Sequence, residues 1–179
     1  LFVQAKAGGA PRVEAVAYAG GVVRVAPFGA VAIDLAGADL SRPVPILADH
    51  VDTLDGVLGQ GLATVEGGRL LLRGTLSAAT EAGRTVLALA RDGVALQCSI
   101  GFEPTRRERF SAGQPARING RELVAPEGGL TVIRSGRLRE VSILPLGADP
   151  ETDVTIRAKG TTMTTEPTNQ PPADTPDAE

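Results

Sequence analysis

Short apolar runs separated by turn residues cover most of the chain. Residues 12–18 (RVEAVAY) begin with alternating polar and apolar positions, and residues 21–27 (GVVRVAP) and 43–48 (PVPILA) carry further apolar runs. Alternation with a period of two is typical of strands that bury one face. The pattern therefore predicts a fold made mainly of short strands.

Glycine pairs predict where these strands turn. Residues 61–76 (GLATVEGGRLLLRGTL) predict a hairpin that turns at Gly67–Gly68, and Asn119–Gly120 is a strong signal for another tight turn. Residues 130–144 (LTVIRSGRLREVSIL) predict a further hairpin about Ser135–Gly136. No internal repeat is visible.

One segment has helical spacing instead. Residues 77–93 (SAATEAGRTVLALARDG) place apolar side chains three and four positions apart, with a possible cap at Ser77 and Gly93 just past the end. With no Trp, one Tyr and four Phe, the interior must be filled by aliphatic side chains, which suits a small barrel. We expect a mainly β fold, a largely antiparallel β-barrel with one or a few external helices.

The composition changes abruptly near the end of the chain. Residues 158–179 are rich in Pro, Thr and acids and contain almost nothing to bury, so they predict a disordered tail or linker. Residues 1–157 are expected to form one folded domain, because 179 residues leave little room for a second one.

Charge and cysteine usage exclude several classes of protein. The net charge is −3, with 18 Lys and Arg spread among 21 acids, which argues against nucleic acid or an anionic membrane as a partner. The densest basic cluster, Arg106–Arg109, is interpreted as a solvated strand end or loop. Cys98 is the only cysteine, so no internal disulfide forms. Without a membrane-length apolar run or a signal-peptide pattern in residues 1–20, we expect a soluble intracellular protein.

Three side chains suited to nucleophilic catalysis lie on or beside predicted strands. His50 ends VPILADH and is the only histidine, Ser99 lies in LQCSIGF, and Glu140 lies in LREVSIL. A serine nucleophile needs a base, and the base needs a third group that fixes its tautomer. His50, Ser99 and Glu140 supply these three types, although only the fold can bring them together.

Structural interpretations of the same residues stay open at this point. His50 is equally typical of a hydrogen-bonded residue at a strand end, Ser99 of a small residue beside a neighbouring strand, and Glu140 of a surface partner for Arg137 or Arg139. Ser142 shares a strand face with Glu140 and is a second candidate for hydrogen bonding to the site.

Two other kinds of chemistry involve residues of these segments. Cys98 is next to Ser99, and because adjacent strand residues face opposite ways, only one of them can face His50; a buried apolar role suits Cys98 better. Asp49, Asp52 and Asp55 lie close to His50 in ADHVDTLDG, but their spacing fits no common calcium or zinc pattern. No cofactor or metal is therefore expected.

Between about Pro43 and Pro150 these segments, in this order, resemble the prohead (capsid maturation) proteases of tailed phages, whose fold is related to that of herpesvirus assembly proteases. The matching stretches are VPILADH, the glycine-bearing strands of residues 57–76, RDGVALQCSIGF, and LREVSILPLGADP. The resemblance implies a herpesvirus-protease-like fold.

The resemblance also implies an activity. It implies a serine endopeptidase that acts inside the assembling procapsid in the host cytoplasm, removing scaffold segments of the major capsid protein and cleaving itself, with homodimers or higher self-association possible. His50 would be the base, Ser99 the nucleophile and Glu140 the group that orients His50. Herpesvirus proteases use a second histidine in the third role, which this chain lacks.

Two points are left open by the resemblance. The oxyanion donor is a backbone N–H near Ile100 and Gly101, or a side chain such as Arg139. The alternative functions are a catalytically inactive scaffold or capsid-assembly module of the same fold, and a metal-dependent hydrolase.

Overall fold

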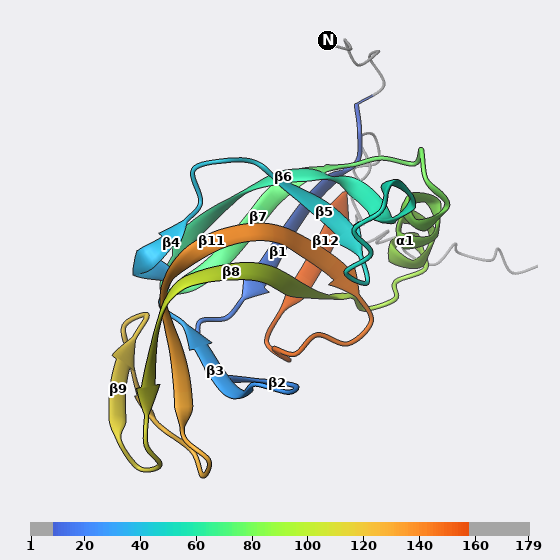
Figure 1. Ribbon diagram of the computed structural model, residues 1–179. Helices are drawn as coiled ribbons and strands as arrows, with labels where there is room; N and C mark the ends of the chain where they lie inside the picture. The colour runs from blue at the N-terminus through green and yellow to red at the C-terminus, as the bar shows by residue number, and fades with distance from the viewer. Residues whose placement is uncertain (1–8, 158–179) are drawn as a thin grey trace, which may run out of the picture.

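The computed structural model describes residues 9–157, in which most strands form one long curled sheet with a helix beside it (Figure 1). The predicted mainly β architecture is confirmed, and the sheet is a curled half-barrel. The strands are β1 (Arg12–Tyr18), β2 (Val23–Val25), β3 (Gly29–Ile33), β4 (Ala38–Asp39), β5 (Val44–Ala48), β6 (Val57–Glu66), β7 (Arg69–Leu76), β8 (Gln97–Phe110), β9 (Pro115–Ile118), β10 (Arg121–Val124), β11 (Leu130–Leu144) and β12 (Asp153–Arg157).

Strand β11 is the centre of the sheet. One of its edges pairs in parallel with β3, β4 and β5 in turn, while its other edge pairs antiparallel with β8 along almost its whole length. Beyond β5 the order continues through β6, β7, β1 and β12, and beyond β3 the sheet ends at β2. Residues carried by β5, β8 and β11 therefore meet on neighbouring strands.

The hairpin predicted at Ser135–Gly136 is wrong, because residues 130–144 form the single strand β11. Neither residue has the positive φ that a tight two-residue turn requires, and the pairing with β8 instead shifts register on both sides of Ser135. Gly136 is needed for another reason. A Cβ there would clash with the ring of Phe102 and lie 2.5 Å from the carbonyl oxygen of Glu103. Glycine at this position therefore allows β8 to approach β11 closely.

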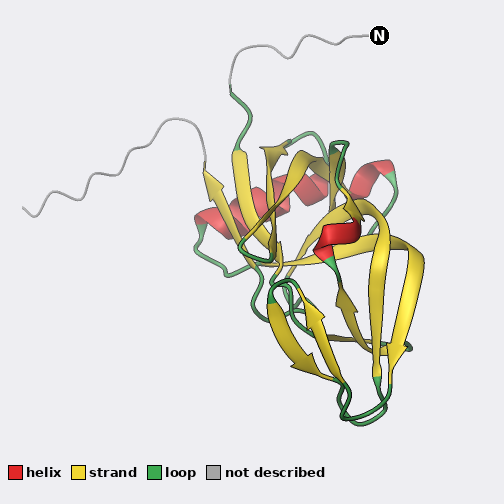
Figure 2. Cartoon of the chain, turned by 90° about the vertical axis from the view of Figure 1, so that its left-hand side faces the viewer, coloured by secondary structure: helices red, strands yellow, loops and turns green. Residues whose placement is uncertain are grey.

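The other two turn predictions are confirmed. Strands β6 and β7 pair up to Glu66 and Arg69, and the intervening Gly67 and Gly68 have φ of 58° and 75°. Asn119, with φ of 54°, and Gly120 join β9 to β10, which form a separate two-stranded sheet (Figure 2). Two-residue hairpin loops of this kind favour glycine and asparagine because both central residues are left-handed.

The predicted helix is α1 (Glu81–Arg91), which lies outside the sheet against β6 and β12 (Figures 1 and 2). The cap prediction is wrong: the N-cap is Thr80, whose Oγ1 accepts a hydrogen bond from the Gly83 N–H at 3.0 Å. Ser77 instead accepts from the Ala79 N–H in the turn before the helix. Gly93 follows the helix with φ of 78°, as expected for its end.

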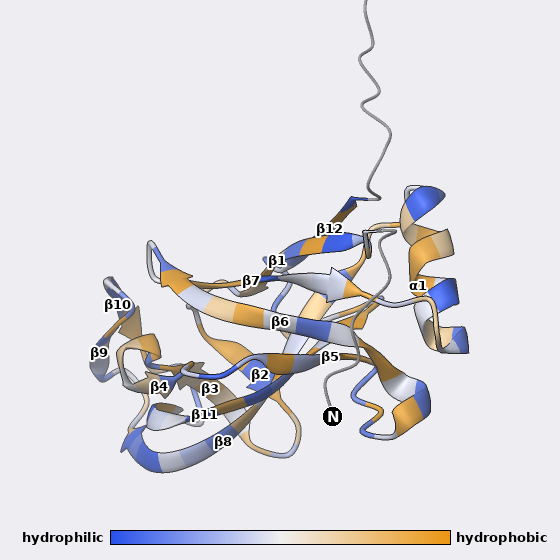
Figure 3. Cartoon of the chain, turned by 90° about the horizontal axis from the view of Figure 1, so that it is seen from above, coloured by the Kyte–Doolittle hydropathy of each residue, from blue (hydrophilic) through white to orange (hydrophobic). Residues whose placement is uncertain are grey.

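Aliphatic side chains fill two cores. The larger lies inside the curled sheet and includes Ile46, Leu58 and Leu72, each fully buried. The smaller one packs Ala116, Ile118 and Ala125 of the β9–β10 region against β3 and β11. The far part of β8 is hydrophilic (Figure 3). That part holds Arg106–Arg109, a solvated strand end as predicted.

Two further expectations concern the end of the chain and its relation to membranes. The predicted disordered tail, residues 158–179, lies outside the described residues, as do residues 1–8. Within residues 9–157, no helix has the length and apolar character needed to cross a membrane.

We expect Gly136→Ala to lower the free energy of unfolding by about 1–3 kcal/mol, because the added methyl group forces β8 and β11 apart. Urea denaturation measures the change. Gly21→Ala is the matched control: the nearest atom to its Cβ would be Arg121 at 3.7 Å, so the change should stay within about 0.5 kcal/mol. Equal effects of the two substitutions would contradict the close approach at Gly136.

Candidate active site

His50 lies in a tight turn at the end of β5. The Val51 N–H donates to the Ala48 carbonyl at 2.9 Å, and the two residues between them, Asp49 and His50, have φ of 48° and 59°. Left-handed backbone costs about 1–2 kcal/mol for a residue with a Cβ. Such a turn persists only where the surrounding structure holds it, and strain of this kind clusters at functional sites.

Strand β11 holds this turn through two hydrogen bonds. The Asp49 N–H donates to the Ile143 carbonyl at 3.2 Å, and the His50 N–H donates to Ser142 Oγ at 3.1 Å. Ser142 is fully buried. The backbone of His50 is therefore fixed against the strand that also carries Glu140.

The carboxylate of Glu140 joins the histidine ring to the serine hydroxyl. Its Oε1 lies 2.9 Å from His50 Nδ1, and its Oε2 accepts a hydrogen bond from Ser142 Oγ at 2.6 Å. The Glu140 side chain is 13% exposed, against 46% for His50. A carboxylate at Nδ1 keeps the proton on that nitrogen, so Nε2 is the nitrogen that can accept a proton from a nucleophile.

A β-bulge sets the direction of Glu140. Leu138 is opposite Phe102, but Glu140 is opposite Gly101, so Arg139 is an extra residue on β11. A Cβ at Gly101 would lie 2.5 Å from Glu140 Oε1, the oxygen that contacts His50. Gly101 therefore leaves the space in which the carboxylate lies. Bulges commonly re-aim a side chain in this way beside active sites.

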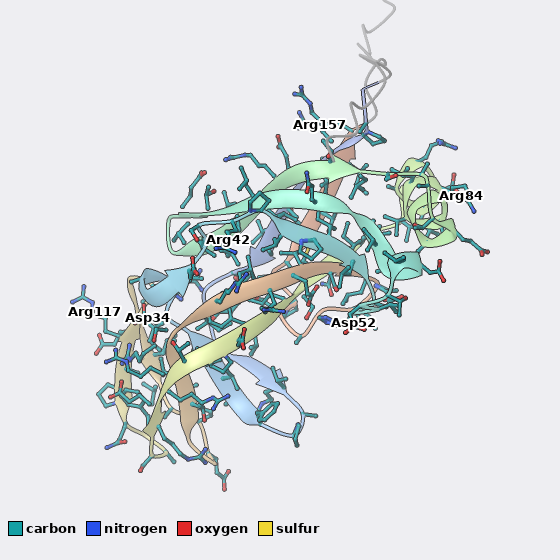
Figure 4. The ribbon with its side chains drawn as sticks, turned by 45° about the horizontal axis from the view of Figure 1, so that its top comes forward. Asp34, Arg42, Asp52, Arg84, Arg117 and Arg157 are labelled. Atoms are coloured by element: carbon teal, nitrogen blue, oxygen red, sulfur yellow. The ribbon has the colours of Figure 1, made fainter. Side chains whose placement is uncertain are left out.

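Ser99 lies directly opposite Ser142 on β8. Residues directly opposite each other on antiparallel strands share a face, with Cβ atoms about 5 Å apart. Ser99 is therefore on the same face as Ser142 and Glu140. Figure 4 labels Asp52, which follows the His50 turn by two residues. Among the described residues no hydrogen bond joins Ser99 to His50, so the structure brings His50 and Glu140 into contact and leaves Ser99 on the adjacent strand.

A cavity of about 610 Å³ borders Ser99 between β8 and the β2–β3 hairpin. Its walls are mostly apolar and include Ile100, Phe102 and the exposed Phe28 of the β2–β3 turn. The N–H of Cys98 donates to Thr152 Oγ1 at 3.1 Å, and this hydroxyl donates to the Cys98 carbonyl at 3.2 Å. Because alternate residues of a strand direct their N–H groups the same way, the N–H of Ile100 also points away from β11.

Of the oxyanion donors expected from the sequence, the structure favours the N–H of Ile100. Strand alternation directs the N–H of Gly101 toward β11, where the ladder uses it. The Arg139 guanidinium lies 3.4 Å from Glu103 Oε2 instead of near Ser99.

Cys98 is part of the hydrophobic core and has no exposed surface. Burial raises the pKa of its thiol to about 12, helped by the negative charges of Asp153 and Glu140. Because the thiolate is the reactive form, a buried, protonated thiol is a poor nucleophile. The expected structural role of Cys98 agrees with this placement.

The aspartates near His50 do not gather into a metal site. Within residues 9–157 no three His, Cys, Asp or Glu side chains come close enough together to hold one ion. Glu140 contacts His50 and not Arg137 or Arg139, so its surface-pairing interpretation is wrong.

The segment LPLGADP, which ends the family resemblance, has a structural role. Asp149 Oδ2 accepts a hydrogen bond from the Ala19 N–H at 2.7 Å, and its Oδ1 accepts from the Glu151 N–H at 3.1 Å. The hydroxyl of Thr152 accepts a hydrogen bond from the backbone N–H of Cys98. The loop after β11 is thereby fastened to the ends of β1 and β8, which keeps the strand of Ser99 in place.

No protein-family model matches this chain, and a search of curated proteins finds no match either.

We expect the protein to lose stability as the pH rises above about 9. Burial raises the pKa of Cys98 from 9.0 and that of Tyr18 from 10.0, each to about 12, so both groups keep their protons in the folded chain at pH values where the unfolded chain releases them. The contribution of these two groups to the free energy of unfolding is constant below pH 9 and falls above it, by up to about 1.4 kcal/mol per pH unit for each group.

Urea unfolding between pH 8 and 10.5 measures this slope. Cys98→Ala should make the slope shallower, because only the contribution of Tyr18 remains. An identical slope in both proteins would show that the thiol is not buried as described.

Proposed function

We propose that this protein is a serine endopeptidase of the tailed-phage prohead protease type, with a herpesvirus-protease-like fold. It would cleave scaffold segments of the major capsid protein, and itself, inside the assembling procapsid. The observation that carries the proposal is the contact of 2.9 Å between Glu140 Oε1 and His50 Nδ1, made on the strand next to Ser99.

The arrangement supports an acid–base role for His50. Glu140 orients the ring and would stabilise the imidazolium that forms, while Ser142 holds both the carboxylate and the His50 backbone. The Nε2 edge of His50 is free to move a proton because nearly half of the side chain is exposed. An exposed histidine held in one orientation is suited to this task.

The proposed reaction has two halves. Ser99 Oγ attacks the carbonyl carbon of the scissile bond as His50 Nε2 takes the hydroxyl proton, and the oxyanion of the tetrahedral intermediate accepts a hydrogen bond from the Ile100 N–H. The intermediate collapses, and His50 returns the proton to the leaving amine, which leaves an acyl ester on Ser99. Water, deprotonated by His50, then attacks the ester carbonyl. The second intermediate collapses, His50 returns the proton to Ser99 Oγ, and the acid product leaves.

This chemistry requires Ser99 Oγ to come within hydrogen-bond reach of Nε2. Catalytic hydrogen bonds are often formed only when substrate is bound. The free side of β8, with its outward-pointing Ile100 N–H, offers backbone groups to an extended peptide, and the apolar cavity beside it offers space for the peptide's side chains. A substrate held there would have its backbone beside Ser99.

The second candidate function is a catalytically inactive scaffold or capsid-assembly module. The observation that favours it is that Ser99 makes no hydrogen bond to His50 within residues 9–157. The same apolar cavity would then bind a capsid or scaffold segment without cutting it.

Co-expression with the major capsid protein of the same phage separates the two candidates. We expect the wild-type protein to shorten the capsid protein and the Ser99→Ala protein to leave it whole, as read from intact masses. His50→Ala should reduce the rate by about a hundred- to ten-thousand-fold, the range typical of acid–base groups.

The matched control is Ser111→Ala, an exposed serine in the turn beyond β8, which should cleave like the wild type. Binding of the capsid protein without a mass change in either protein would favour the scaffold module. Cleavage by Ser99→Ala would place the nucleophile elsewhere.

A further inference from the structure

A second, smaller hollow lies between β11 and the chain that precedes β5. Its volume is about 250 Å³, and it is formed where the chain passes from β4 to β5 alongside β11. The residues around it are Asp39, Ser41, Arg42, Pro43, Val44, Pro45, Arg137, Leu138 and Arg139. Figure 4 labels Arg42 at this end of β5.

Positive charge predominates in this hollow. Three guanidinium groups, those of Arg42, Arg137 and Arg139, are opposed by the single carboxylate of Asp39. Asp39 Oδ1 already accepts hydrogen bonds from the Ser41 hydroxyl at 2.6 Å and the Ser41 N–H at 3.1 Å. These bonds lower the pKa of Asp39, and the charges of Arg137 and Arg42 act in the same direction, so Asp39 stays ionised.

Two of the three arginines have no carboxylate partner among residues 9–157. Arg139 is paired with Glu103 at 3.4 Å, on an exposed surface. Arg42 and Arg137 form no ion pair with any described residue, although other exposed arginines of the sheet do, such as Arg73 with Glu66. The hollow therefore keeps two guanidinium groups available to an added anion.

The strand register gives the distance from this hollow to the candidate nucleophile. Ser99 is opposite Ser142, and Arg139 and Arg137 precede Ser142 by three and five residues on the same strand. At about 3.3 Å per residue, the two arginines lie roughly 10 and 16 Å along the sheet from Ser99. An extended peptide covers that distance in three to five residues.

The bulge at Arg139 brings the hollow and the catalytic candidates onto one face. Arg139 is the extra residue, so its side chain and that of Glu140 both lie on the outer side, while Leu138 before them and Val141 after them are in the core. A peptide whose scissile bond lies at Ser99 can therefore cross the hollow without passing to the other side of the sheet.

We infer that this hollow is a specificity site for an acidic side chain of the peptide substrate, three to five residues from the scissile bond. The inference rests on the proposed endopeptidase function. The two parallel N–H groups of one guanidinium match the two oxygens of a Glu or Asp carboxylate, and such charge-assisted hydrogen bonds discriminate well against a neutral amide.

Binding is tested first, in the full chain carrying Ser99→Ala so that nothing is cleaved. The probes are N-acetyl-glutamate amide and N-acetyl-glutamine amide, which differ only in charge at one side-chain group. We expect the glutamate probe to shift the NMR signals of the Arg42 and Arg137 Nε–H groups and the glutamine probe to leave them in place. Equal responses to the two probes, or none, would overturn the inference, as would sulfate displacing the glutamate probe at equal concentration.

Cleavage specificity is tested next, with Ser99 intact and a pair of peptides from a capsid cleavage site that carry Glu or Gln at each position three to five residues from the cut. We expect a Glu-over-Gln ratio of kcat/KM of about tenfold at one of these positions. Arg42→Gln combined with Arg137→Gln should bring the ratio close to one, whereas Arg12→Gln, an exposed arginine on β1, should preserve it. A ratio that survives the double substitution would assign the preference to other residues.

The two experiments distinguish a failure of the specificity site from a failure of the endopeptidase function. If the probes bind as expected but no capsid protein is ever cut, the endopeptidase function is wrong and the hollow is an acidic-peptide site of a binding module. If the capsid protein is cut but the probes do not bind, the endopeptidase function stands and this specificity site is wrong.

Discussion

The Glu140 carboxylate is the group on which the candidate site depends, because its two oxygens hold two different parts of the chain. One oxygen contacts the His50 ring, and the other accepts the Ser142 hydroxyl, which in turn accepts the His50 N–H. The three residues thus form a closed ring of hydrogen bonds. A buried carboxylate is costly unless such partners satisfy it, and here the same bonds that satisfy it orient the histidine.

This ring is possible because β11 lies between β5 and β8. Parallel pairing with β5 delivers the His50 turn to one edge of β11, and antiparallel pairing with β8 delivers Ser99 to the other. The strain of two left-handed residues, Asp49 and His50, is offset by hydrogen bonds to Ser142 and Ile143. Packing of the core on the inner face therefore sets the geometry of polar groups on the outer face.

The sequence was enough to predict the mainly β fold, the turns at Gly67–Gly68 and Asn119–Gly120, and the helix, because each has a strong local signal. It also indicated Ser142 as a partner of the site, since residues two apart share a strand face. The chain could not reveal that Ser135–Gly136 lies inside a strand. In a sequence, a glycine that allows two strands to approach closely cannot be distinguished from a glycine that makes a turn. The distinction depends on the neighbouring strand, which here is β8 with Phe102.

Other features of the site were invisible for the same reason. Gly101 appeared only as a source of a backbone N–H, whereas its missing side chain makes room for the Glu140 carboxylate. The bulge at Arg139 depends on the register between β11 and β8, and the arginine hollow joins Arg42 to residues almost a hundred positions away. Such features depend on pairing between strands that are far apart in the sequence, so composition and periodicity cannot predict them.

The proposed catalysis requires that Glu140, held by Ser142, makes His50 a base for Ser99. A fluorophosphonate, which phosphonylates only activated serines, tests it directly when the modified residue is located by peptide mass spectrometry and the rate is followed in Glu140→Gln, Ser142→Ala and, as the control on the same strand, Ser135→Ala. We expect a single adduct on Ser99, formed more slowly in Glu140→Gln and Ser142→Ala and at the wild-type rate in Ser135→Ala. The absence of an adduct on Ser99, or an adduct that forms at the same rate in Glu140→Gln as in the wild type, would contradict this role of Glu140.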